Sequence, residues 1–80
     1  MTPHEAKEWV GSAVYDAESL RLATCCAEAL RQDNPALGIE VELGQLRELV
    51  KVVSPTQSQL DEADLLRESV ALSLALWGDL

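Results

Sequence analysis

The sequence has little of what most enzymes and nucleic-acid-binding proteins depend on. Its 80 residues include one histidine, no phenylalanine, and six lysines and arginines against 14 aspartates and glutamates. Too few cations are present to contact the phosphates of DNA, RNA or an anionic membrane. The lone histidine, His4, has no nucleophile or orienting partner marked near it in the sequence. We therefore expect a protein that is not an enzyme, with no catalytic residue, no metal site and no cofactor.

Cysteine is equally scarce, and its placement points to a reducing compartment. Cys25 and Cys26 are neighbours, so a disulfide between them would be strained on a helix, and a zinc site needs ligands in spaced pairs. The N-terminus carries acids where a signal peptide carries bases. The longest apolar run, residues 70–77, is too short to span a bilayer. These features predict a soluble cytoplasmic protein with two reduced thiols.

The length allows one domain, residues 1–80, and the apolar spacing predicts an all-α fold. Thr2 and Glu5 form the pattern of a capping box, and apolar residues at intervals of three and four predict a helix that ends before Pro35. Gly11-Ser12 is a weak point that can split this helix. We expect two further helices, over most of 39–53 and from about 57 to 77. The bundle thus has three helices, or four if the first is split.

Residues 38–43 are ambiguous in secondary structure. Ile39, Val41 and Leu43 alternate with glutamates, which is the period of a half-buried strand. The same region also continues a helical stripe: Ile39, Leu43, Leu46, Val50 and Val53. A lone strand has no partner in this chain, so a helix is the better prediction.

The last predicted helix is apolar almost all the way round between Val70 and Trp77. A helix on the surface of a domain would show one apolar stripe. This segment is therefore either the centre of the bundle or a face for self-association as a homodimer, for which the candidates are Leu72, Leu76, Trp77 and Leu80. Trp9, by contrast, has the helical spacing of a core residue.

The acidic residues are the feature with the most functional weight. Spacing predicts four local ion pairs: Glu18–Arg21, Glu28–Arg31, Glu48–Lys51 and Asp64–Arg67. This leaves the following acids largely uncompensated: Glu5, Glu8, Asp16, Asp33, Glu40, Glu42, Asp61, Glu62, Glu68 and Asp79. Such an excess either keeps a small apolar bundle soluble or forms a negative surface that docks on a basic partner.

The leading hypothesis is a non-enzymatic protein that binds a partner through this acidic surface. Its most concrete form is an inhibitor that occupies the basic nucleic-acid-binding face of another protein, since carboxylates along helices can mimic phosphates. The residues we expect at this interface are Glu40, Glu42, Asp61, Glu62 and Asp64. In size and charge the chain is similar to small phage proteins that block CRISPR or restriction machinery, which act as DNA mimics. A structural or assembly module that uses the apolar C-terminal helix is the alternative.

A third hypothesis comes from a partial resemblance. The segment Asp16-Ala17-Glu18-Ser19-Leu20 resembles the Asp-Ser-Leu attachment motif of acyl and peptidyl carrier proteins. Two later segments, residues 37–41 and 54–56, are also similar to parts of that family. The resemblance implies that Ser19 carries a phosphopantetheine arm, and it predicts a mass gain there on treatment with a phosphopantetheinyl transferase and coenzyme A.

Overall fold

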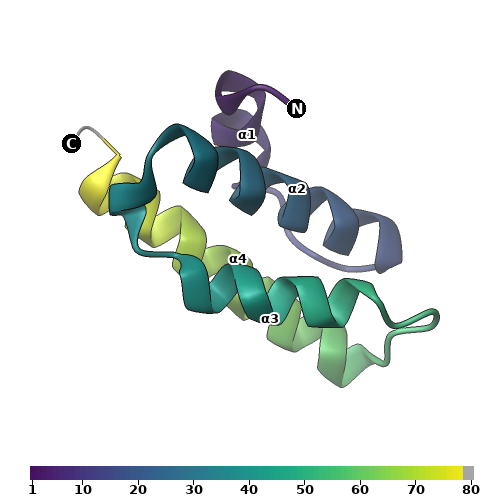
Figure 1. The fold of residues 1–80 in the computed structure, drawn as a ribbon. Helices are drawn as coiled ribbons and strands as arrows, with labels where there is room; N and C mark the ends of the chain where they lie inside the picture. The colour runs from purple at the N-terminus through teal and green to yellow at the C-terminus, as the bar shows by residue number, and fades with distance from the viewer. Residues whose placement is uncertain (79–80) are drawn as a thin grey trace.

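Four α-helices and one short 3₁₀ helix make up the computed structural model, which describes residues 1–78 (Figure 1). They are α1 (Pro3–Trp9), α2 (Ala17–Asp33), η1 (Pro35–Leu37), α3 (Glu40–Val50) and α4 (Gln57–Trp77). The predicted all-α bundle is confirmed, in its four-helix form. Asp79 and Leu80 lie outside the described residues.

The first predicted helix is split at its weak point. Thr2 caps α1, whose end is followed by a turn in which the Ser12 N–H donates to the Trp9 carbonyl at 2.9 Å. The chain then starts again at a capping box. The Asp16 carboxylate accepts from the Ser19 N–H at 2.7 Å, and the Ser19 hydroxyl accepts from the Asp16 N–H at 3.0 Å. A strong second start at Asp16 therefore completes the break that Gly11-Ser12 permits.

Residues 38–50 resolve the ambiguity in favour of a helix. Gly38 has φ 68°, the left-handed conformation that redirects the chain after η1, and α3 begins two residues later. Ile39, Leu43 and Leu46 of the expected stripe are buried. Val53 is the exception, because α3 ends at Val50 and leaves Val53 in the following loop with 95% of its surface exposed.

Helix α4 has the predicted bounds. The Thr56 hydroxyl accepts from the Gln59 N–H at 3.2 Å, while the Gln59 side chain accepts from the Thr56 N–H at 2.9 Å, so a second capping box fixes the start. At the other end the Gly78 N–H donates to the Leu74 carbonyl at 2.8 Å. The loop between α3 and α4 is short, which makes these two helices antiparallel neighbours.

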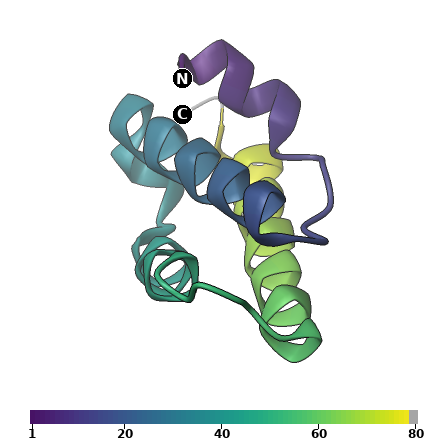
Figure 2. The same ribbon diagram turned by 90° about the vertical axis from the view of Figure 1, so that its right-hand side faces the viewer.

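The core lies where α2, α3 and α4 meet. Helix α2 packs against α1, α3 and α4, and α3 also packs along α4 (Figure 2). The largest fully buried side chains come from these three helices and the segment before α3: Leu20, Cys26, Leu30, Ile39, Leu46 and Val70. The prediction that Trp9 is a core residue is wrong. It sits at the end of a seven-residue helix and is 49% exposed, while its neighbours Ala6 and Val10 are buried.

The glycines allow the same substitution to be tested with opposite expected results. Gly38→Ala should lower the free energy of unfolding by about 1 kcal/mol, because a β-carbon is disfavoured at positive φ. Gly44→Ala should raise it by roughly 0.5 kcal/mol, because Gly44 is inside α3 and open space surrounds its missing β-carbon. Urea unfolding of both variants measures the difference. A loss of stability in Gly44→Ala would contradict the geometry of α3.

Candidate protein-binding surface on α3 and α4

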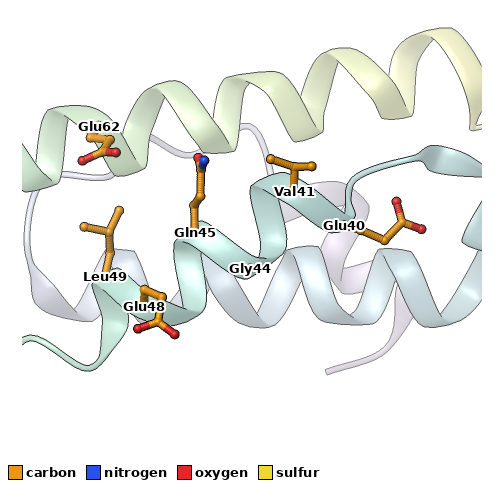
Figure 3. Close-up of a pocket in the computed structure, with 7 residues that line it drawn as sticks. All are labelled: Glu40, Val41, Gly44, Gln45, Glu48, Leu49 and Glu62. Atoms are coloured by element: carbon orange, nitrogen blue, oxygen red, sulfur yellow. The ribbon is translucent and has the colours of Figure 1, made fainter.

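An open groove of about 450 Å³ runs between the outer faces of α3 and α4 (Figure 3). Helix α4 contributes one lining residue, Glu62, and α3 contributes six: Glu40, Val41, Gly44, Gln45, Glu48 and Leu49. In the close-up, Glu40 lies at one end of the groove, and Glu48 and Glu62 lie at the other. The groove thus has carboxylates at both ends, with Val41, Gly44 and Gln45 between them. The structure brings two of the predicted interface residues, Glu40 and Glu62, to this one site.

The three carboxylates of the groove differ in their partners. Glu40 Oε1 lies 3.6 Å from Nε of Arg31, and Glu48 Oε1 lies 3.2 Å from Nζ of Lys51. Both pairs are exposed, so each contributes little to stability and leaves its carboxylate accessible. Glu62 is exposed and forms no ion pair among residues 1–78. The negative charge that a partner would meet uncompensated is therefore concentrated on the α4 side.

Two further acids predicted at the interface, Asp61 and Glu42, differ in their exposure to solvent. Asp61 is exposed on α4 and accepts a hydrogen bond from Nε2 of Gln57 at 2.9 Å. Glu42 faces the seam between α3 and α4, where its Oε1 accepts from the Ser69 hydroxyl at 3.4 Å. Its Oε2 is buried and has no hydrogen-bond partner among the described residues. Glu42 therefore belongs to the contact between the two helices more than to the outer surface.

Asp64 is committed to the fold. Its Oδ1 accepts from the Val14 N–H at 2.9 Å and from Nε and Nη2 of Arg67, both at 3.1 Å. The Arg67 guanidinium in turn donates from Nη1 to the Val10 carbonyl at 3.0 Å. We call these four residues, Val10, Val14, Asp64 and Arg67, the Arg67 clamp. The clamp ties α4 to the turn between α1 and α2, and it leaves Asp64 little capacity to bind a partner.

The clamp also makes stability depend on pH. The Val14 N–H is the main cause that holds the pKa of Asp64 below its ordinary value of 3.8. Burial acts in the opposite direction, and the Arg67 guanidinium adds to the lowering through its hydrogen bond and its charge. Since the pKa is lower in the folded than in the unfolded chain, ionised Asp64 stabilises the fold above pH 3.8, and this contribution is lost as the pH falls through the folded-state value.

Asp64→Asn should consequently unfold more easily at pH 7, by about 1 kcal/mol, because a neutral amide replaces a charge-assisted acceptor. The gap between variant and wild type should close as the pH is lowered below 3.8. Urea unfolding at a series of pH values measures the difference in the free energy of unfolding between the two proteins. A gap that stays constant down to the lowest pH would show that the charge of Asp64 contributes nothing.

The observed ion pairs differ from the predicted ones on α2. Glu48–Lys51 and Asp64–Arg67 form as expected. Arg31 instead pairs with Glu40, and Glu28 pairs with Arg47 at 3.1 Å, so both bridge α2 and α3. No Glu18–Arg21 pair forms within the described part of the chain. Glu40, Glu68 and Glu8, predicted to be uncompensated, have Arg31, Arg67 and His4 as neighbours.

The outer face of α4 also carries exposed leucines. Leu72 and Leu76, both predicted for self-association, are 60% and 63% exposed, and Leu65 is 65% exposed. Trp77 is half exposed, and its carbonyl accepts from Asn34 Nδ2 at 3.4 Å. The prediction for Leu80 falls outside the described residues. Leu65 was not predicted to belong to this face, although its spacing of seven residues from Leu72 is a signal for it.

Ser19 is half-buried at the start of α2, and its hydroxyl is fully used by the capping box. It accepts from the N–H groups of Tyr15 and Asp16 at 2.9 and 3.0 Å and donates to the Asp16 carbonyl at 3.0 Å. A hydroxyl offers one proton and two lone pairs, so the Ser19 hydroxyl can form no further hydrogen bond. The Ser19 N–H, which donates to the Asp16 carboxylate, and after it the Ser19 side chain hold the pKa of Asp16 below its ordinary value. Attachment of a phosphopantetheine arm to Ser19 would remove its hydroxyl proton from this arrangement.

The remaining candidates for chemistry are the two cysteines and His4. Cys26 is buried, which raises the pKa of its thiol to about 11, with a smaller contribution from Cys25. Cys25 is exposed. In α1, Nε2 of His4 lies 3.2 Å from Oε1 of Glu8. Among residues 1–78, no cluster of histidine, cysteine and acidic side chains has the arrangement of a metal site. None of the described helices combines the length and the apolar character that crossing a membrane requires.

Comparisons with known proteins found no match: no protein-family model, no curated protein and no solved structure matches this chain.

Proposed function

We propose that the protein is a non-enzymatic binding module that docks on a basic surface of another protein through the outer faces of α3 and α4. The observation that carries the proposal is the charge of α4. Its outward acids, Asp61, Glu62 and Glu68, are exposed, while its one basic residue, Arg67, is buried at 8% exposure. A face of one charge sign steers an oppositely charged partner and speeds association at low salt.

The groove supports the same proposal from the α3 side. Glu48 and Glu62 place two carboxylates at the end of the groove nearest the α3–α4 loop, beside Leu49. Protein interfaces combine an apolar centre with a charged rim. The lining of this groove combines apolar Val41 and Leu49 with the carboxylates of Glu40, Glu48 and Glu62.

In its most concrete form the protein is an inhibitor that competes with nucleic acid for the basic face of its partner. The carboxylates of Glu40, Glu62 and Asp61 then stand where the partner otherwise binds phosphates. Phosphate-binding faces carry lysine and arginine, so they present the charge that these carboxylates complement.

The test begins with a pull-down from nuclease-treated native lysate, eluted in steps of rising salt. The recovered partner is then titrated with wild-type protein and with Asp61→Lys/Glu62→Lys at low salt. We expect the reversal to weaken binding at least about tenfold, because opposed charges become like charges. Duplex or single-stranded nucleic acid added to the complex should displace the protein from the partner.

The matched control is Glu8→Lys/Asp33→Lys, which changes the net charge equally at two exposed positions near the ends of α1 and α2. It should leave affinity nearly unchanged. Equal losses in both variants would mean that overall charge alone drives binding and would refute the site. Binding that nucleic acid does not displace would refute the inhibitor and leave the binding module.

A further inference from the structure

A second apolar stripe follows α4 on the side turned away from the core. It consists of Leu65, Ser69, Leu72 and Leu76, at successive intervals of four, three and four residues, and we call it the outer stripe. Residues at such intervals lie above one another along one face of a helix. The three leucines are each at least 60% exposed.

The three leucines of the outer stripe have no part in the core of the bundle, whereas Ser69 lies at its edge and donates to Glu42 of α3 at 3.4 Å. The core-facing side of α4 is formed by other residues: Leu60, Ala63, Arg67, Val70 and Leu74. Among residues 1–78 the helices in contact with α4 are α2, α3 and η1, and the side turned away from them is open (Figure 2). A surface helix needs one apolar face, so a second one that stands in water marks an interaction site.

The intervals of the outer stripe are those of a coiled-coil seam. With Leu65 and Leu72 in the d positions of a heptad, Ser69 and Leu76 occupy a positions. Asp61 and Glu68 then fall in g positions, which are the positions that select a partner helix by charge. Both are exposed acids, and the same edge of α4 carries no exposed base.

We infer that the outer stripe binds an amphipathic helix of another protein, with leucine-like residues along its centre and lysines or arginines along its edges. Charge complementarity selects this occupant over a second copy of the chain, because two copies would bring Asp61, Glu68 and their equivalents together at a net charge of −8 each. The inference rests on the proposed function, and it specifies that the basic partner presents a helix that lies along α4.

The probe is a synthetic helical peptide of about three heptads, with leucine at a and d and lysine at e and g. Its control carries glutamate in place of lysine. Each peptide is titrated with the wild-type protein at low and at physiological salt, and binding is followed by fluorescence anisotropy. The lysine peptide should bind at least about tenfold more tightly than the glutamate peptide. Equal affinity for the two peptides would overturn the inference.

Variants then locate the binding site. Leu65→Gln/Leu72→Gln should weaken binding of the lysine peptide at least about tenfold. The matched pair Tyr15→Gln/Val53→Gln removes exposed apolar side chains outside both the groove and the outer stripe, and it should change the affinity less than about twofold. Circular dichroism checks that each variant folds. Equal effects of the two pairs would overturn the inference. So would a wild-type dimer in sedimentation equilibrium that Leu65→Gln/Leu72→Gln abolishes, since the occupant is then a second copy.

Binding assays with the natural partner distinguish failure of this inference from failure of the proposed function. If Asp61→Lys/Glu62→Lys abolishes its binding but Leu65→Gln/Leu72→Gln does not, the binding module stands and the helical partner does not. If neither pair affects its binding, both proposals fail.

Discussion

Arg67→Ala should lower the free energy of unfolding by about 3 kcal/mol, because it removes one partner of a largely buried charge pair and leaves polar groups unpaired. The guanidinium donates to the Val10 carbonyl and to the Asp64 carboxylate, and its side chain is only 10% exposed. A chain of this length has a total stability of roughly 4–12 kcal/mol. The melting temperature should fall by roughly 15 °C, as measured by circular dichroism.

Two companion variants show that the loss comes from the clamp. Arg67→Lys keeps the charge but not the planar fork, so it cannot donate to both partners in the same geometry and should be intermediate. Arg67→Ala and Asp64→Ala should also be coupled in a double-mutant cycle, by about 1 kcal/mol or more. Independent, additive effects of the two alanines would contradict a shared role.

Leu46→Ala should cost about 3 kcal/mol, and Leu65→Ala less than about 0.5 kcal/mol, although the substitution is the same. Leu46 is fully buried between α3 and the rest of the core, so its truncation leaves a cavity, whereas Leu65 is 65% exposed. Chemical denaturation of both variants gives the comparison. A loss at Leu65 as large as that at Leu46 would mean that the outer stripe serves folding, which would remove the main reason to assign it a partner.

Local signals in the sequence predicted the helices well because caps act over three or four residues. Thr56 and Gln59 mark the start of α4, and Asp16 with Ser19 marks the second start that divides the first helix. The left-handed turn at Gly38 and the short η1 before it were not predicted, since neither produces a periodic pattern.

The faces of the helices were harder to predict, because packing between distant segments decides them. Asp61 and Asp64 are both aspartates and lie three residues apart, yet one is exposed and the other accepts a hydrogen bond from Val14, 50 residues away in sequence. Arg67 shows the same limit: spacing predicted its pair with Asp64 but not its burial. That burial is what leaves the outer face of α4 without a basic side chain, so the charge asymmetry could be described only from the structure.

The Arg67 clamp has a consequence for the order in which the chain folds. Helix α1 has seven residues, too few to be stable alone. The residues that follow it, Val14 and Val10, bond to α4 across 50 and 57 residues of sequence. The segment from Met1 to Val14 should therefore join the bundle last and be the first to open. The Val14 amide lies outside every described helix. In native-state hydrogen exchange it should nevertheless exchange more slowly than an unbonded loop amide, at the rate at which the N-terminal segment separates from α4.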